Sequence, residues 1–160
     1  MKTKYMVLLY VLAMVSANLI VWKLGKWASP FIAFVLIGFD LTMRDVLHER
    51  LTRLQMLAVI CVGGLITYFA NPSAQMIAVA SASAFGLAAL ADWTVYTVMH
   101  KRQWMVRSNV SNVAGAAVDS LVFPTIAFGM LLPQIVLLQF AAKVGGGFVW
   151  SLLLRKAKFA

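Results

Sequence analysis

Charged residues are scarce in this chain, and acidic residues are the scarcest. Of its 160 residues, 12% are charged and only 5 are acidic, whereas 62% are hydrophobic. Soluble globular domains carry about 25% charged and roughly 45–50% apolar residues, so this chain has too little polar surface to cover a soluble fold of its size. The composition excludes a soluble enzyme, a disordered tail and a disulfide scaffold, and it predicts a membrane protein.

Residues that build common catalytic and metal sites are also few. The chain has one cysteine, Cys61, and two histidines, so an intrachain disulfide is impossible and a standard zinc site is not expected. His48-Glu49 resembles the start of a zinc-binding HExxH helix, but Thr52 stands where the second histidine would lie. Neither a Walker phosphate loop nor a GxSxG motif occurs. We therefore expect no enzyme activity, no metal and no cofactor.

Long hydrophobic runs are the dominant feature of the sequence. Six of them are long enough to cross a bilayer, which takes about 20 helical residues. They cover Tyr5–Trp22, Ala28–Leu47, Leu54–Ala70, Ala74–Met99, Ser108–Leu132 and Gln134–Leu154. These spans use most of the chain, so we predict an all-α polytopic membrane protein, with a single six-helix transmembrane domain over residues 1–160 embedded in a lipid bilayer.

The basic residues gather in alternate connections of this predicted topology. With the N-terminus inside, the inner segments carry Lys2, Lys4, Arg44, Arg50, Arg53, Lys101, Arg102, Arg107, Arg155, Lys156 and Lys158. The outer segments carry only Lys23 and Lys26. Cytoplasmic loops of membrane proteins are enriched in lysine and arginine. We therefore expect an inner-membrane protein with both termini in the cytoplasm, and we attribute the net charge of +9 to topology rather than to a nucleic-acid partner.

Polar and ionisable side chains nevertheless occur inside the predicted spans, where each charge costs a few kcal/mol. The candidate site residues are Asp40, Arg44, Asp45 and Glu49 in the second span, Asp92, Trp93 and Tyr96 in the fourth, Asn109, Asn112, Asp119 and Phe123 in the fifth, and Lys143 in the sixth. Because isolated charges facing lipid would be penalised, we expect the polar residues of the last three spans to converge in one cavity near the middle of the membrane.

Structural roles are the alternative interpretation for several of these side chains. The groups concerned are Asp40 with Arg44 as an intrahelical ion pair, Asp45 and Glu49 with Arg50 and Arg53 as a solvated helix end, and Asp119 with Lys143 as an interhelical pair. The i, i+4 spacing suits the first group, and a basic cytoplasmic helix end suits the second. Asn18 in the first span is expected to form an interhelical hydrogen bond.

One stretch of the fifth span resembles a known family. Ser108–Phe123, read as SNVSNVAGAAVDSLVF and followed by Ala127–Gly129, is similar to the signature of the queuosine-precursor transporter family, also called the vitamin-uptake-transporter family. Arg44–Glu49, Leu90–Thr97 and Lys143 are similar to further pieces of it in the same order. The resemblance implies six transmembrane helices, uptake of 7-cyano- or 7-aminomethyl-7-deazaguanine, and a core similar to the substrate-binding subunits of energy-coupling-factor vitamin transporters.

The candidate residues suit such a base chemically. A deazaguanine presents two neighbouring N–H donors that one carboxylate can accept together, and a carbonyl that an amide or ammonium can bind. The acceptor would be Asp92 or Asp119, the donors Asn109 or Asn112 and Lys143, and the stacking groups Trp93, Tyr96 or Phe123. Two alternatives stay open: a binding subunit for another vitamin-like molecule, and a structural assembly subunit. An energising membrane partner or a second copy of the chain is a further partner hypothesis.

Overall fold

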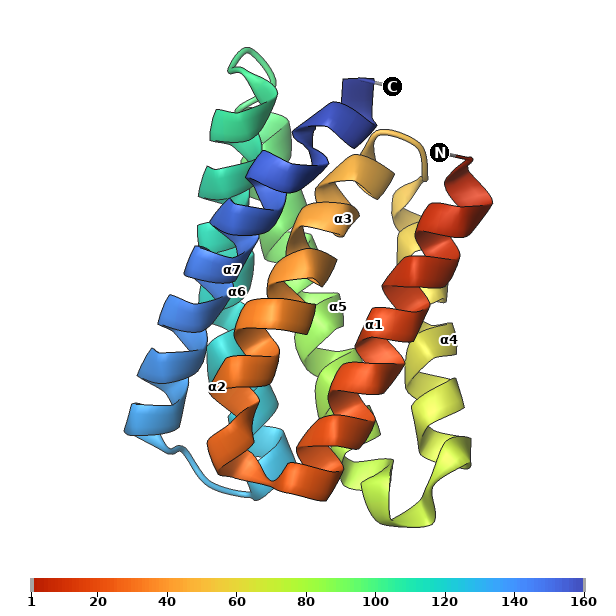
Figure 1. Cartoon of the computed structure of the whole chain (residues 1–160), viewed down its shortest axis with the longest axis vertical. Helices are drawn as coiled ribbons and strands as arrows, with labels where there is room; N and C mark the ends of the chain where they lie inside the picture. The colour runs from red at the N-terminus through yellow and green to blue at the C-terminus, as the bar shows by residue number, and fades with distance from the viewer. Residues whose placement is uncertain (1, 160) are drawn as a thin grey trace.

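The computed structural model describes the backbone of residues 2–159 and the side chains of residues 2–154. Within that range the chain is a bundle of helices without strands (Figure 1). Its helices are α1 (Thr3–Leu24), α2 (Ser29–Ile32), α3 (Gly38–His48), α4 (Arg53–Ala70), α5 (Gln75–Val98), α6 (Trp104–Phe128) and α7 (Pro133–Phe159), with the short elements η1 (Lys26–Ala28), η2 (Ala33–Ile37) and η3 (Pro72–Ala74). The predicted all-α class is confirmed.

Among the described residues, five segments are long and apolar enough to span a membrane. They are Thr3–Leu24, Arg53–Ala70, Pro72–Val98, Trp104–Phe128 and Pro133–Leu154. The predicted second span is instead a composite of α2, the π-helical η2 and α3. These elements follow one another over residues 29–48, which at 1.5 Å per residue gives a length of about 30 Å, the thickness of a hydrocarbon core. We refer to this segment as the composite helix.

Local sequence signals explain where several of these helices begin and end. Thr52 and Gln55 form a reciprocal capping box at the start of α4. Gly129 ends α6 with a left-handed φ of 69°, a conformation that glycine adopts without a steric penalty.

α1 begins, and α7 ends, at the upper end of the bundle in Figure 1. The α3–α4 and α5–α6 connections lie at the same end, which we call the terminal end.

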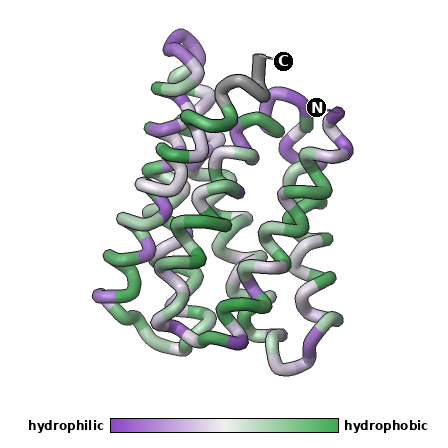
Figure 2. Tube along the Cα trace, viewed as in Figure 1, coloured by the Kyte–Doolittle hydropathy of each residue, from purple (hydrophilic) through white to green (hydrophobic). Residues whose placement is uncertain are grey.

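The bundle reverses the usual distribution of polar residues. Large apolar side chains such as Leu54, Phe69 and Val98 are at least three-quarters exposed, at 79%, 77% and 75%. Figure 2 shows hydrophobic residues along the flanks of the helices and hydrophilic ones in the connection between α5 and α6. Aspartate, arginine and lysine side chains are buried inside. This arrangement suits a protein whose flanks contact lipid, because there a charge is least costly when it faces the bundle interior.

The composite helix packs unusually closely on α7. Gly146 lies so near the backbone of Phe34 that no Cβ atom would fit there. Thr42 Oγ1 donates a hydrogen bond of 3.0 Å to the Gly147 carbonyl, and Trp150 Nε1 donates one of 2.8 Å to the Val35 carbonyl. The run Gly145–Gly147 is therefore a close-packing surface. It holds the charged face of α3 at a set distance from the polar residues of α6 and α7.

Candidate functional site

Two clusters contain most of the buried polar side chains among the described residues. The first, the cavity cluster, contains Asn18, Ser29, Ser81, Asp119, Ser120, Gln139 and Lys143. The second, the Arg44 cluster, contains Arg44, Asp45, Asp92, Ser108, Ser111 and Asn112. Each draws its residues from at least three segments of the chain, so neither site exists before the helices pack.

An ion pair between α6 and α7 is the centre of the cavity cluster. Lys143 Nζ lies 2.7 Å from Asp119 Oδ2, and both side chains are 2% exposed. Lys143 also donates to Gln139 Oε1 at 2.7 Å and to Ser120 Oγ at 3.2 Å. An ammonium group has three donors, so these three acceptors satisfy it. The predicted interhelical pair of Asp119 and Lys143 is therefore present.

Asp119 keeps one acceptor unused in this arrangement. Its Oδ1 atom is buried and accepts no hydrogen bond from any described residue. The same residue lines a small cavity within the bundle. A buried acceptor without a donor is costly, and a pair retained for stability alone would gain from satisfying both oxygens. An unsatisfied oxygen on a residue that lines the cavity is therefore the feature of this cluster that a ligand could use.

The cavity lies between α1, the composite helix, α5, α6 and α7. Its polar wall consists of Asn18, Ser29, Ser81, Asp119, Gln139 and Lys143, and its apolar wall includes Ile32, Ile37, Phe85 and Phe123. Its free volume is about 20 Å³, which is on the scale of a single water molecule. The structure therefore presents this site closed.

Two hydrogen bonds link the polar wall of the cavity across helices. Gln139 Nε2 donates to Ser29 Oγ at 3.0 Å, which links α7 to the start of the composite helix. Asn18 Nδ2 donates to Thr67 Oγ1 at 3.2 Å, which links α1 to α4. The interhelical hydrogen bond expected for Asn18 is thus confirmed, although its side chain also lines the cavity.

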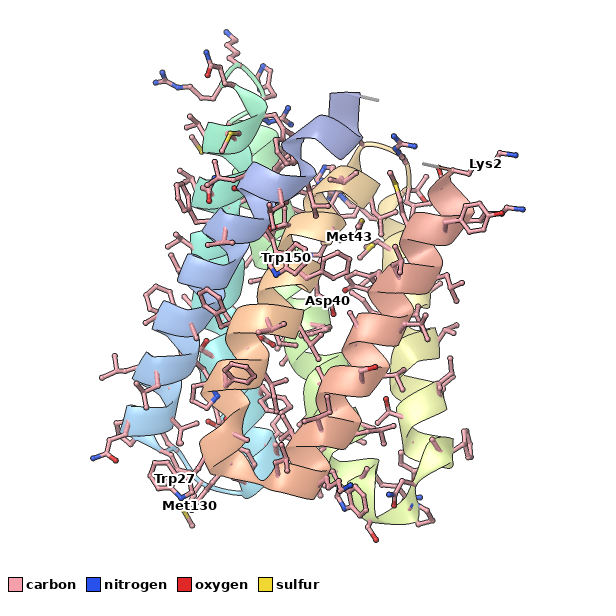
Figure 3. The ribbon with its side chains drawn as sticks, in the orientation of Figure 1. Lys2, Trp27, Asp40, Met43, Met130 and Trp150 are labelled. Atoms are coloured by element: carbon pink, nitrogen blue, oxygen red, sulfur yellow. The ribbon has the colours of Figure 1, made fainter. Side chains whose placement is uncertain are left out.

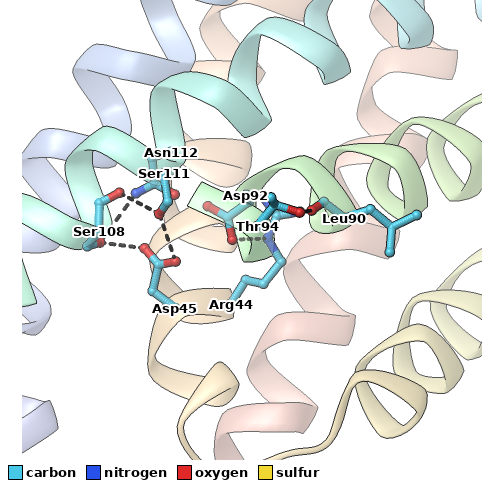
Figure 4. A network of polar contacts seen from close by, with 8 residues as sticks. All are labelled: Arg44, Asp45, Leu90, Asp92, Thr94, Ser108, Ser111 and Asn112. Atoms are coloured by element: carbon cyan, nitrogen blue, oxygen red, sulfur yellow. Dashed lines mark hydrogen bonds and ion pairs between the residues drawn. The ribbon is translucent and has the colours of Figure 1, made fainter. Parts of the chain in front are cut away.

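The Arg44 cluster lies nearer the terminal end and is shown in Figure 4. Arg44 Nε is 3.5 Å from Asp92 Oδ2. Asp45 accepts hydrogen bonds from Ser108 at 2.5 Å and from Ser111 at 3.4 Å. Asn112 Nδ2 is 3.5 Å from Ser108 Oγ, at the limit of a hydrogen bond. These contacts join α3 to α5 and α6.

The expected intrahelical pair of Asp40 with Arg44 is wrong. Arg44 turns towards α5 and pairs with Asp92 instead. Gly115 of α6 makes this possible, because a Cβ atom there would lie 2.9 Å from Arg44 Nη2 and 3.3 Å from the Cβ atom of Asp92. The spacing of four residues permits an ion pair, but a carboxylate on a neighbouring helix has replaced the local partner.

The predicted solvated helix end is correct only for its last residues. Glu49, Arg50 and Arg53 are exposed. Asp45 is fully buried and accepts hydrogen bonds from the two serines of α6, so assigning it to the solvated end is wrong. Glu49 receives a hydrogen bond of 2.8 Å from the Tyr96 hydroxyl. Periodicity could not reveal this difference, because residues 45 and 49 lie on the same face of one helix.

Three other candidate residues lie outside the cavity. The ring of Tyr96 is 4.7 Å from that of His48, and the Arg107 guanidinium lies 3.9 Å above the Tyr96 ring. The His48 ring is 4.1 Å from that of Trp93. Asn109 donates to the Met105 carbonyl at 2.7 Å and to Ser151 Oγ at 3.1 Å. These residues pack the terminal end of the bundle.

The expectation that all these polar residues converge in one cavity is therefore only partly met. Asp119, Lys143 and Phe123 line the cavity, whereas Asp92 and Asn112 belong to the Arg44 cluster. The two clusters are adjacent, because Arg44 lies against Gly115, one turn before Asp119 on α6. One turn of α6 therefore contacts the Arg44 cluster, and the next turn contributes Asp119 to the cavity cluster.

Sequence reasoning missed several residues of the cavity wall. Gln139 offered a signal, since it lies one turn before Lys143 on the same face. Ser29 stands in a Ser-Pro pair typical of a helix start, and Ser81 lies in an Ala/Ser-rich run typical of helix packing. Phe85 carried no signal distinguishing it from other apolar residues. Among the side chains of residues 2–154, no group of three or more His, Cys, Asp or Glu residues is arranged to hold a metal ion.

Comparison with known proteins assigns the chain to a family. Residues 2–154 match the family described as "Putative vitamin uptake transporter". No curated protein and no solved structure matches the chain. The family match includes both polar clusters and all five long apolar helices. With its membrane-spanning bundle and buried polar cavity, the chain belongs to the vitamin uptake transporter family.

Proposed function

We propose that this protein takes up a 7-deazaguanine base, 7-cyano- or 7-aminomethyl-7-deazaguanine, across the cytoplasmic membrane. Family membership supports uptake across a membrane. The likeness of Ser108–Phe123 to the queuosine-precursor signature supports the class of base. The observation that carries the proposal is the open Oδ1 atom of Asp119 at the wall of a cavity that also holds a lysine.

Each part of the cavity wall has a role in this proposal. Asp119 accepts the two neighbouring N–H groups of the base, since a carboxylate can receive both at once. Lys143 or Gln139 donates to the carbonyl or nitrile of the base. Phe85 and Phe123 pack on the ring faces. A recognition site of this type combines apolar walls with a few polar groups that orient the ligand.

Binding requires the bundle to open, because ligand pockets are roughly 300–1,000 Å³ in volume and the closed cavity has about 20 Å³. The hydrogen bond between Gln139 and Ser29 joins two walls of the cavity. Separation of α7 from the start of the composite helix would break this bond and enlarge the cavity. The glycine contact between Gly146 and Phe34 lies further along the same pair of elements. It would serve as the point about which they part.

Three other functions are distinguished by measurements of binding and uptake. A binding subunit for a different vitamin-like molecule would bind another ligand in the same cavity, and an energising membrane partner would then drive its release. A purely structural subunit would bind no base at all. An enzyme would return a chemically altered base, whereas a transporter returns it unchanged.

The decisive experiment measures binding and uptake together. Purified protein should bind 7-cyano-7-deazaguanine in preference to guanine. Cells that lack their own precursor synthesis should accumulate the labelled base only when the protein is expressed. Thr125→Val is the matched control, because Thr125 is an exposed hydroxyl on the same helix as Asp119 and bonds only to its own backbone turn. Absence of both binding and uptake in the wild-type protein would contradict the proposal.

In the proposed orientation, the protein lies in the inner membrane and its terminal end faces the cytoplasm. The positive-inside bias supports it. A cytoplasm-only fluorescent reporter fused after Ala160 should fluoresce, and alkaline phosphatase at the same position should be inactive. A reporter inserted at Asn71, which connects α4 to η3, should give the opposite result. Active phosphatase after Ala160 would overturn this topology.

A further inference from the structure

Asp40 is a buried carboxyl group that the proposed base-binding site leaves without a role. It lies on α3, and its side chain is 2% exposed. Neither of its oxygen atoms receives a hydrogen bond from any described residue. The two interior cations have other partners, since Arg44 pairs with Asp92 and Lys143 pairs with Asp119. Figure 3 labels Asp40 in the interior of the bundle, between α3 and α1.

The interior contains more carboxyl groups than cations. Among the described residues, the fully buried carboxyl groups are Asp40, Asp45, Asp92 and Asp119, and the fully buried cations are Arg44 and Lys143. Asp45 accepts hydrogen bonds from two serines, whereas Asp40 has neither a hydrogen-bond donor nor an ion-pair partner among the described residues. An isolated ionised carboxylate in a dry interior takes up a proton instead of remaining charged. Asp40 therefore holds a proton in this closed state.

The groups around Asp40 place it between the two polar clusters. Ile37, three residues earlier on the composite helix, lines the cavity, and Arg44 follows one turn later. The nearest charges acting on Asp40 are Arg44 on its own helix and Asp119 on α6, and Tyr10 of α1 also interacts with it.

The buried charged residues of α5 and α7 are paired with the neighbours of Asp40, and the charged residue of α4 is exposed. Asp92 of α5 pairs with Arg44, and Lys143 of α7 pairs with Asp119. Arg53, the one charged residue of α4, is exposed at the start of that helix. When the cavity opens, water that reaches Ile37 needs to pass one more turn of helix to reach the Asp40 carboxyl. Asp40 is thus positioned to exchange a proton with whichever side the cavity faces.

We propose that Asp40 is a proton-binding site that couples uptake of the base to the proton gradient. Its carboxylate takes one proton from the outer side while the cavity is open outwards, and the neutral form permits closure while Arg44 is paired with Asp92. The proton leaves to the cytoplasm after the base. The empty protein then returns with the Asp40 carboxylate ionised and paired with Arg44 four residues later on the same helix, so one proton crosses per base and the carboxyl returns to its starting form. This inference rests on the proposed uptake function.

The test uses the full chain in proteoliposomes with labelled 7-cyano-7-deazaguanine. An inward proton gradient of one pH unit should drive accumulation towards a ceiling of about tenfold, and a protonophore should abolish it. Asp40→Asn should still exchange labelled for unlabelled base but should not accumulate it. Asp40→Glu, which restores a carboxyl group, should recover accumulation. Thr125→Val, a change at an exposed hydroxyl of α6 outside both polar clusters, is the control and should accumulate base like the wild type.

The outcomes separate this inference from the proposed function. Wild-type vesicles without any base exchange would contradict the uptake function itself. Exchange in the wild type without gradient-driven accumulation would leave that function standing and overturn the role of Asp40. Accumulation that persists in Asp40→Asn, or is lost to the same extent in Thr125→Val, would also overturn it. If Asp40→Asn fails to fold, a pH-sensitive dye outside wild-type vesicles should report proton entry when base is added, and no pH change would refute coupling.

Discussion

The two buried polar clusters differ in how completely their charges are satisfied. In the cavity cluster, the Lys143 ammonium has three acceptors, and the remaining open atom is an acceptor on Asp119 beside free space. In the Arg44 cluster, the ion pair is longer, at 3.5 Å, and Arg44 Nε and Nη2 donate no hydrogen bond to any described residue. Arg44 packs against Gly115, and it lines no cavity described above.

This difference teaches that a buried charge has two distinct uses here. A well-satisfied pair with one open acceptor is pre-organised for a ligand, because few of its groups need to move when the ligand arrives. A longer pair packed against glycine joins three helices and is sensitive to their spacing. The first arrangement suits recognition of a base, and the second suits a contact that changes when the helices move.

Removal of Lys143 should cause the largest loss of stability among the changes that compare the two clusters. Lys143→Met leaves the Asp119 carboxylate buried without a cation, so it should destabilise the protein by about 3–5 kcal/mol. The double variant Lys143→Met with Asp119→Leu should regain most of that loss, because no charge is stranded. Thermal unfolding in detergent measures both. A double variant as unstable as the single one would show that the pair is not the source of the effect.

Matched aspartate-to-asparagine changes in the two clusters should separate binding from packing. Asp119→Asn converts one acceptor oxygen into a donor, so affinity for the base should fall roughly 10- to 150-fold, equivalent to about 1.5–3 kcal/mol. Asp92→Asn should lower the melting temperature and leave the affinity nearly unchanged. Calorimetric binding and melting curves give both quantities. Normal binding by folded Asp119→Asn would make Asp119 a structural residue, and equal binding losses in both variants would unite the clusters into one site.

A small change at Gly115 should sharpen the description of the Arg44 cluster. Gly115→Ala places a methyl group 2.9 Å from Arg44 Nη2, so Arg44 must move and stability should fall by about 1–3 kcal/mol. Gly86→Ala is the matched control, because a Cβ atom there meets nothing within 4 Å. Denaturant unfolding of the two variants provides the comparison. Equal stability of the two variants would mean that the Arg44 side chain can move away from residue 115 without a loss of stability.

The smallest expected effect concerns the hydrogen bond between α1 and α4. Thr67→Val removes the acceptor of Asn18 Nδ2, and interhelical hydrogen bonds in membrane proteins contribute about 0.6 kcal/mol on average and roughly 1.7 at most. Melting should therefore shift by only a few degrees, while affinity for the base changes little. Ser73→Ala, in the exposed turn between α4 and α5, is a neutral reference. A large loss of affinity in Thr67→Val would extend the binding site to α4.

Particular residues show how far the candidate site could be predicted from the sequence. Asp119 and Lys143 were recognisable as functional candidates because each is an ionisable residue within an apolar span. Their pairing was foreseeable as one alternative. The partner of Arg44 was not, because helical spacing describes neighbours on one helix and Asp92 lies on another. The role of Gly115 was equally hidden, since its value lies in the room it leaves for a guanidinium group from α3.

The sequence by itself determined the helical membrane class, because a chain this apolar must satisfy its backbone within helices and expose its flanks to lipid. It also determined which positions carry buried charge and where most of the helices end. Only the tertiary structure decided which charges meet. The close contact of α7 with the composite helix and the packing of α5 on α6 divided one predicted site into a cavity and a separate ion-pair cluster. That division depends on distances between helices far apart in the chain, which helical periodicity does not encode.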